Sequence, residues 1–215
     1  MQGKFCKFKG RICKIYADFR LEFVKLNTKG HSILLDTKNT LFVCIDIQER
    51  LLPLMAHKDE VIKNANLLLQ VAEILGAQSL VSEQYPKGLG KTCEQIKIPQ
   101  NAKVLEKTSF GIFGDRAMRE FIASSGCKTL VIFGIEAHIC VLQSVVQAVN
   151  LGYECVVVGD CISSRSGKSY EMALNFFHSL SATETLSVLP AESIVFALLK
   201  DSKHANFKEI SALIK

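Results

Sequence analysis

The feature that most constrains the fold is an alternation between short apolar runs and longer segments with helical periodicity. The clearest runs, residues 41–45 and 129–133, carry no charge and consist almost wholly of apolar residues, which is typical of strands buried on both faces. After several of the runs, apolar residues recur at helical spacing until a glycine such as Gly76 or Gly126 ends the segment. The predicted strands are residues 41–45, 79–82, 103–107, 129–133, 155–158 and 182–186.

Strands that alternate with helices through short connections indicate a parallel sheet wound by right-handed crossovers. The sequence therefore predicts an α/β fold, with a doubly wound, Rossmann-like, six-stranded parallel sheet in three α/β/α layers. In such a fold, ligands bind at the carboxyl ends of the strands, where the strand order reverses. The predicted helices lie at residues 61–75, 117–122, 139–149, 170–180, 192–199 and 207–214.

Two parts of the chain differ in character. We expect residues 35–215 to form the domain and residues 1–34 to be an N-terminal extension, in which Phe and Ile alternate with Lys and Arg as in a basic amphipathic helix. One interpretation of the extension is a mitochondrial presequence, which Asp18 and Glu22 weaken. The others are a segment that packs on the domain and a doubtful start site. With no long apolar span and no signal-peptide pattern, we expect a cytoplasmic protein, or a mitochondrial one if the extension is a presequence.

The charge distribution bears on the partners of the chain. The formal charge of +5 arises mainly in the first 40 residues, which hold nine of the 26 basic and three of the 21 acidic residues. The remainder is close to neutral, so the domain gives no argument for nucleic acid binding. The eight cysteines form no CxxC pair, so no zinc or redox motif is present. We expect no cofactor, no nucleic acid partner and no membrane association.

Cys140 is predicted to lie at, or within a turn of, a helix N-terminus at the carboxyl end of the strand at residues 129–133. A helix N-terminus stabilises a thiolate, and its free N–H groups can hold an oxyanion. Asp46 and Lys107 are predicted to end two other strands on the same rim. Taken singly, such residues are often a helix cap, a surface charge and an inert core thiol. Together they supply the nucleophile, base and cation that covalent catalysis needs.

Four blocks of the sequence, in this order and spacing, resemble the signatures of the isochorismatase-like cysteine hydrolases. The resemblance extends from about residue 35 to residue 189 and is closest to the eukaryotic isochorismatase domain-containing proteins, which the segment Ser82-Glu-Gln-Tyr-Pro-Lys-Gly-Leu-Gly90 also resembles. The blocks are Leu41-Phe-Val-Cys-Ile-Asp-Ile-Gln-Glu49, Glu106-Lys-Thr-Ser-Phe110, Gly134-Ile-Glu-Ala-His-Ile-Cys-Val141 and Gly159-Asp-Cys-Ile-Ser-Ser-Arg165.

The resemblance implies a hydrolase that cleaves an amide (C–N) bond of a small molecule through a thioester intermediate. It implies Cys140 as the nucleophile, Asp46 as the general base and Lys107 as the cation that lowers the thiol pKa. It also implies a cis peptide bond, without proline, between Ile135 and Glu136. That bond is expected to aim the N–H of Glu136, with that of Cys140, at the substrate oxyanion.

Departures from related families narrow the expectation. Nicotinamidases carry a histidine-containing metal motif near the second strand, where this chain has Glu83-Gln-Tyr-Pro86, so we expect no catalytic metal. Isochorismatases proper lack the cysteine and cleave a vinyl ether. Tyr85 and Phe110 are expected as substrate-binding pocket walls. His138 is expected to be a wall or an oligomer contact, because at its spacing from Cys140 the two side chains do not face each other.

The expected quaternary structure bears on an alternative to the enzymatic function. We expect a homo-oligomer, a dimer or higher, from the resemblance and from the apolar stretch at residues 194–199. The alternative to an enzyme is a catalytically weak or inactive binding or regulatory protein that retains the hydrolase fold and acts through oligomer contacts.

Overall fold

The computed structural model describes residues 35–181 and 185–214. Within these residues, all the strands are parallel and form one sheet in the order β3-β2-β1-β4-β5-β6. The predicted extension at residues 1–34 lies outside the described residues. The strands are β1 (Thr40–Ile45), β2 (Gln78–Gln84), β3 (Lys103–Lys107), β4 (Thr129–Ile135), β5 (Glu154–Ser163) and β6 (Leu186–Leu189).

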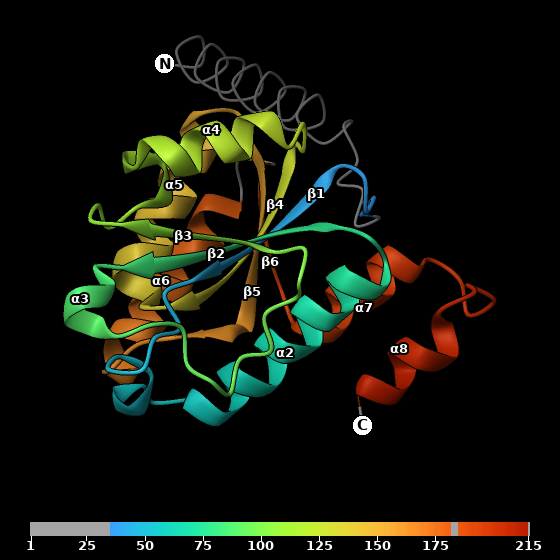
Figure 1. Ribbon diagram of the computed structural model, residues 1–215, viewed down its shortest axis with the longest axis horizontal. Helices are drawn as coiled ribbons and strands as arrows, with labels where there is room; N and C mark the ends of the chain where they lie inside the picture. Colours follow the sequence, from blue (N-terminus) through green and yellow to red (C-terminus); the bar gives the residue numbers. More distant parts are fainter. Residues whose placement is uncertain (1–34, 182–184, 215) are drawn as a thin grey trace, which may run out of the picture. The chain divides into compact units, whose positions relative to one another are not determined.

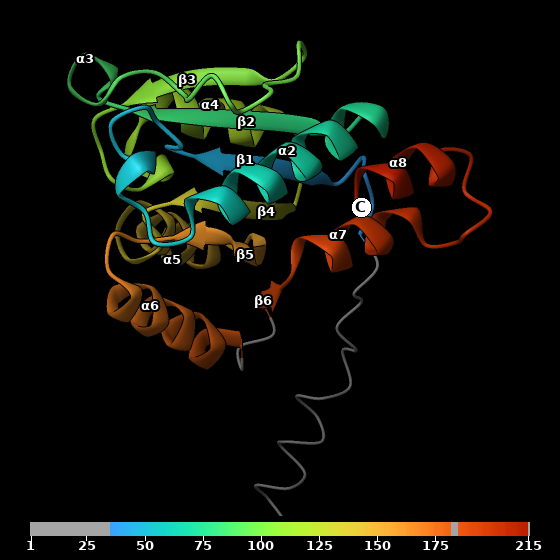
Figure 2. The same ribbon diagram turned by 90° about the horizontal axis from the view of Figure 1, so that it is seen from below.

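Helices cover both faces of this sheet, as Figures 1 and 2 show. Helices α2 (Lys58–Ile74), α7 (Ala191–Leu199) and α8 (Phe207–Leu213) lie on one face. Helices α4 (Arg116–Ser124), α5 (Leu142–Asn150) and α6 (Gly167–Leu180) lie on the other. The predicted doubly wound, three-layer α/β/α fold is therefore confirmed. The remaining helical elements are α3 (Pro86–Leu89), the 3₁₀ turns η1 (Leu52–Leu54) and η2 (Ile112–Gly114), and the π-helical turn η3 (Ala137–Val141).

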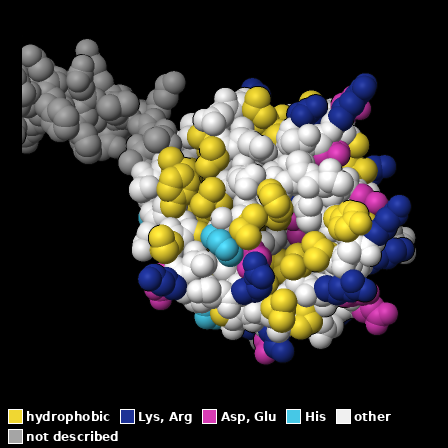
Figure 3. Space-filling view, turned by 90° about the vertical axis from the view of Figure 1, so that its left-hand side faces the viewer, with side chains coloured by type: hydrophobic (Ala, Val, Ile, Leu, Met, Phe, Trp, Pro, Cys, Tyr) yellow, Lys and Arg dark blue, Asp and Glu magenta, His cyan; other side chains and the backbone are white. Residues whose placement is uncertain are grey.

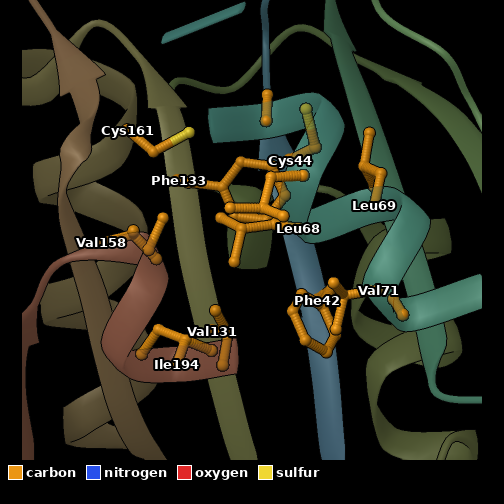
Figure 4. Close-up of a cluster of buried hydrophobic side chains, with 14 of the residues drawn as sticks. Phe42, Cys44, Leu68, Leu69, Val71, Val131, Phe133, Val158, Cys161 and Ile194 are labelled. Atoms are coloured by element: carbon orange, nitrogen blue, oxygen red, sulfur yellow. The ribbon is translucent and has the colours of Figure 1, made fainter. Parts of the chain in front are cut away.

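The two core layers follow from the period of two in the strands, because successive side chains point to opposite faces. Every residue of β1 is buried. Phe42 packs towards α2 and α7 in the cluster drawn in Figure 4, and Val43 packs towards α4 and α5. Such double burial explains why the run at residues 41–45 contains no polar side chain.

Local signals set the helix ends. The side chain of Asp115 caps α4 by accepting a 3.2 Å hydrogen bond from the N–H of Met118. Ser166 caps α6 in the same way. Gly76 and Gly126, which the sequence predicted to follow the helices observed as α2 and α4, both have positive φ angles. Helices commonly end in this conformation, which glycine adopts without the steric cost of a Cβ atom.

The fifth strand is longer than the sequence predicted. We expected it at residues 155–158, but β5 continues to Ser163. Asp160 lies inside the longer strand and accepts a 2.8 Å hydrogen bond from the N–H of Ala191 at the start of α7. The pairing of β4 with β5 shifts register between Ile132 and Gly134, and beyond the shift Ile135 pairs with Ser163. Ser163 therefore ends β5 at the rim.

The apolar stretch at residues 194–199 has a role in the core. Its side chains are buried beside α2, apart from that of Phe196, so its composition does not indicate an oligomer surface. The strand predicted at residues 182–186 lies later in the chain: β6 spans Leu186–Leu189 and shares only Leu186 with the prediction, while residues 182–184 lie outside the described part. Among the residues described, none of the helices combines the length and apolar character needed to cross a membrane.

Candidate active site

The strand order reverses between β1 and β4, which lie side by side at the centre of the sheet. Asp46 directly follows β1, Lys107 is the last residue of β3, and Cys140 lies in η3 just after β4. The structure thus brings the three predicted reactive residues to one rim of the sheet. Figure 3 views the molecule from the side to which the strands of Figure 1 point, and hydrophobic side chains gather across that face.

Asp46 is the most constrained of the three residues. Its side chain is fully buried and its φ angle is 51°, a conformation that residues other than glycine adopt infrequently. The N–H of Asp46 donates to the carbonyl of Ser82 at 3.1 Å, and the hydroxyl of Ser82 donates to Oδ1 at 2.7 Å. β2 therefore fixes both the backbone and one carboxylate oxygen.

Lys107 binds the other carboxylate oxygen of Asp46. Its Nζ lies 2.6 Å from Oδ2 of Asp46, and both side chains have zero exposure to solvent. The same ammonium donates to Oε1 of Gln84 at 2.7 Å and to the carbonyl oxygen of Phe110 at 3.0 Å. A buried ammonium is tolerated only with such pairing.

Cys140 lies beside this pair, close enough for the charges of Asp46 and Lys107 both to act on its thiol. The cis peptide expected between Ile135 and Glu136 is present. The carbonyl of Cys140 accepts a 2.6 Å hydrogen bond from Ser144 on α5. α5 thus holds the backbone of Cys140 next to the buried ion pair.

The protonation of Cys140 differs from the expectation. Burial raises the pKa of the Cys140 thiol to about 12, the charge of Asp46 adds to the rise, and Lys107 only partly opposes it. We had expected the helix N-terminus and Lys107 to lower this pKa, but desolvation is the larger effect. Burial also raises the pKa of Asp46, against the opposing influence of Lys107 and Ser82. The resting site therefore holds a neutral thiol beside a carboxylate of increased basicity.

Glu136 contributes through its side chain. The buried carboxylate accepts hydrogen bonds through Oε2 from the backbone N–H of Arg165 at 3.0 Å and from the guanidinium Nε at 3.2 Å. Close by, Nδ1 of His138 lies 2.9 Å from Oγ of Ser164. The segment after β5 is in this way attached to η3, and His138 is directed to Ser164.

The two predicted aromatic walls have different positions. Tyr85 and Phe110 expose 54% and 55% of their surface. Tyr85 lines a cavity of ≈290 Å³ that also reaches Lys107, whereas Phe110 serves the site through its carbonyl group. A larger cavity of ≈570 Å³ lies beside the start of α2 and contains none of the predicted site residues.

Gly134 brings β4 and β1 together next to the site. Its φ angle is 119°, and a Cβ atom there would lie 2.1 Å from the carbonyl oxygen of Ile45. No side chain fits between the strands at this point, since real Cβ contacts are never that short. Glycine thus permits the spacing at which the residues after both strands meet.

Sequence reasoning missed the role of two glutamines. Oε1 of Gln48 accepts from the N–H of Gln84 at 2.7 Å, and Nε2 of Gln48 donates to the Gln84 carbonyl at 3.1 Å. Both residues stand within segments that carried the family resemblance, but only the fold shows that they pair. In the part of the chain described here, no group of three or more His, Cys, Asp or Glu side chains could hold a metal ion.

Comparison with known proteins finds a family that matches most of the chain. The profile described as "Isochorismatase domain" matches residues 40–187. Isochorismatase domain-containing protein 1 of Salmo salar is 36% identical over 200 residues, which is 91% of this chain, and its counterpart in Danio rerio is 34% identical over 84% of this chain. The matches span 68% and 62% of those two proteins, so each of them extends well beyond the shared region.

Solved structures share the fold. The MAR1 ribonuclease of Caenorhabditis elegans is similar over 84% of this chain and 92% of its own, with a TM-score of 0.77 and 28% identity. The YcaC gene product of Escherichia coli, described as an octameric hydrolase of unknown specificity, is similar over 84% of this chain and 89% of its own, with a TM-score of 0.72 and 15% identity.

Proposed function

The chain belongs to the isochorismatase family, and from this premise we propose that it is a cysteine hydrolase that cleaves the C–N bond of a small amide through a thioester intermediate. The observation that carries the proposal is the position of the Cys140 thiol beside the buried Asp46–Lys107 pair, where both charges act on it. A thiol with an adjacent base and a water-poor environment is the arrangement that nucleophilic catalysis requires.

The first half of the reaction forms the thioester. Because the Cys140 thiol is neutral at rest, its proton moves to Asp46 as the sulfur attacks the carbonyl carbon. The backbone N–H groups of Glu136 and Cys140 receive the oxyanion. Asp46 then returns the proton to the amide nitrogen, the C–N bond breaks, and the amine leaves.

The second half consumes one water. Asp46 takes a proton from the water, whose oxygen attacks the thioester carbon, and the carbon–sulfur bond breaks. The departing sulfur regains the proton from Asp46, so the products are a carboxylic acid, an amine and the free enzyme. Lys107, whose Nζ lies 2.6 Å from Oδ2 of Asp46 at rest, orients this carboxyl group through both halves and stabilises its charged form each time the proton has been passed on.

The substrate is proposed to be small, because the cavity next to the site is small. At ≈290 Å³, this cavity lies at the lower end of the range for small-molecule sites. Tyr85 and Pro86 give it an apolar wall, while Glu106 and Asp115 add polar groups. We place one end of the substrate here, beside Lys107.

A panel of small amides, followed by amine release, tests this proposal. Cys140→Ala is expected to reduce turnover by at least about 10³-fold, since the nucleophile is lost. Cys155→Ala is the matched control, because Cys155 is also a buried thiol with its pKa raised to about 12 but lies inside β5. A rapid-quench mass spectrum should show an acyl group on Cys140. Wild-type turnover by Cys140→Ala would exclude the mechanism.

One structural neighbour is described as a ribonuclease, so RNA belongs in the same panel. We expect no RNA cleavage, because the chain beyond its first 40 residues carries almost equal numbers of basic and acidic side chains, whereas phosphate backbones are bound by positive patches. RNA cleavage that disappears in Cys140→Ala would replace the amide in the proposal.

We propose further that the chain forms a homo-oligomer. The octameric description of the Escherichia coli neighbour motivates this, and the exposed pair Met172 and Phe176, one turn apart on α6, offers an apolar surface. Light scattering at micromolar concentration should give a mass at least twice 23.8 kDa. A monomer under those conditions would contradict the proposal.

A further inference from the structure

We propose that Gln84 is a positioning residue, which holds the Lys107 ammonium on Asp46 and leaves it no N–H group to donate to the substrate. This inference rests on the proposed hydrolase function. It assigns a role to a residue at the end of β2, between the strands that carry Asp46 and Lys107.

The hydrogen-bond capacity of lysine is the first step. An ammonium has three donors and no acceptor. In the described structure, all three donors of Lys107 have partners, namely Oδ2 of Asp46, Oε1 of Gln84 and the carbonyl of Phe110. Lys107 consequently has no proton to offer a substrate. Its effect on the reaction passes through Asp46 and through its positive charge.

The orientation of the Gln84 amide is the second step. Its Nε2 donates to the carbonyl of Thr108 at 2.7 Å, which directs Oε1 towards the ammonium. The backbone of Gln84 is in turn held by both ends of the Gln48 amide. Nε2 of Gln48 also donates to the carbonyl of Gly90 at 2.6 Å. A continuous series of hydrogen bonds therefore connects Gln48 to the Asp46–Lys107 pair.

The neutrality of the glutamine is the third step. An amide oxygen completes the ammonium's hydrogen bonds without competing for its charge, so that the charge acts on Asp46 and Cys140. A glutamate at position 84 would share that charge between two carboxylates. The positive influence on the Cys140 thiol would then decrease, and ionisation of the thiol would become harder.

The experiment measures the rate at which iodoacetamide alkylates Cys140 as a function of pH, by mass spectrometry on the full chain. Gln84→Glu, which is nearly isosteric, is expected to slow alkylation at a fixed pH by about tenfold, the effect of one pKa unit. Gln84→Met removes the acceptor without adding charge, which disfavours the charged ammonium, and it should also slow alkylation. Gln78→Glu introduces the same charge at the exposed start of β2 and should leave the rate unchanged.

The outcomes separate this inference from the proposed function. If Gln84→Glu and Gln84→Met both alkylate at the wild-type rate while their melting temperatures fall, Gln84 is only structural and the inference is wrong. That result would leave the role of Cys140 in hydrolysis intact. Conversely, slowed alkylation in a protein that hydrolyses no amide would support the role of Gln84 and contradict the proposed amide hydrolysis.

Discussion

Two ion pairs in this protein have the same length and opposite environments. Lys107 and Asp46 lie 2.6 Å apart with no exposure at the strand-end rim, and Arg116 and Glu120 lie 2.6 Å apart on α4 with 84% and 63% of their side chains exposed. The exposed pair is screened by water and contributes little. The buried pair cannot lose one partner without leaving a charge in the interior. The difference teaches that burial, and not distance, decides what an ion pair does.

A third pair lies between these extremes. Glu136 is buried, while its partner Arg165 keeps 58% of its side chain exposed, at a distance of 3.2 Å. If burial decides the outcome, the cost of breaking the three pairs should fall in the order Lys107–Asp46, Glu136–Arg165, Arg116–Glu120.

The largest effect is expected from Lys107→Met. This change leaves the Asp46 carboxylate buried without its cation, and breaking such a pair typically costs about 3–5 kcal/mol. Turnover should fall by about 10²–10⁴-fold, because the base loses its positioning partner. Urea unfolding and amide hydrolysis measure the two effects, with Arg116→Met as the control. A stability loss below about 1 kcal/mol would contradict the comparison.

The next effect concerns the pH dependence that Asp46 imposes. Because burial raises its pKa above the ordinary value, the folded protein binds this proton more tightly than the unfolded chain. As pH rises from about 3.9 through the folded pKa, this contribution to stability is lost. Over the same range the ionised fraction of Asp46 increases, and with it the turnover that needs Asp46 as a base. Asp46→Asn should remove both slopes. Unfolding curves and kcat/KM across pH test this, and a stability slope that persists in Asp46→Asn belongs to another group.

Glu136→Gln is expected to have an intermediate effect. The buried carboxylate accepts from a backbone N–H and a guanidinium, and hydrogen bonds to charged groups contribute about 1.5–3 kcal/mol. Thermal unfolding should show a loss in this range, with faster hydrogen exchange at the amide of Arg165. Arg165→Met, which keeps the backbone bond, should cost less. Equal losses in the two variants would show that the guanidinium dominates.

Arg116→Met should have the smallest effect. Exposed pairs four residues apart on a helix contribute about 0.3–0.5 kcal/mol, and salt screens them further. The melting temperature should change little in dilute buffer and still less in 1 M NaCl, where the Debye length is about 3 Å. A loss comparable to that of Glu136→Gln would mean that burial does not order the three pairs.

The parts of the fold that follow from local pattern were predictable from the sequence. The uncharged runs at residues 41–45 and 129–133 become the central strands, because side chains buried on both faces leave a continuous apolar signature. Gly76 and Gly126 mark helix ends, because their positive φ angles suit glycine. Asp46 could be placed on the rim because it directly follows such a run.

What could not be predicted depends on partners distant in the sequence. The part of β5 past Asp160 pairs with the end of β4, and no local residue signals it. The direction of the Cys140 pKa depends on how deeply the fold buries the sulfur, which outweighs the helix N-terminus that the sequence did reveal. Gln84 acquires its role only when β2 comes to lie between β1 and β3.

The close approach at Gly134 has a consequence for the genetic variation that this protein tolerates. Every single-nucleotide change of a glycine codon that alters the amino acid introduces a side chain with a Cβ atom, or a stop. A Cβ atom at this position would meet the carbonyl of Ile45 at 2.1 Å, directly before the residue proposed as the base. Missense variants at codon 134 should accordingly behave as loss-of-function alleles whichever residue they encode, Gly134→Ala included. The codon is thus one at which the smallest chemical change and the largest are expected to have the same phenotype.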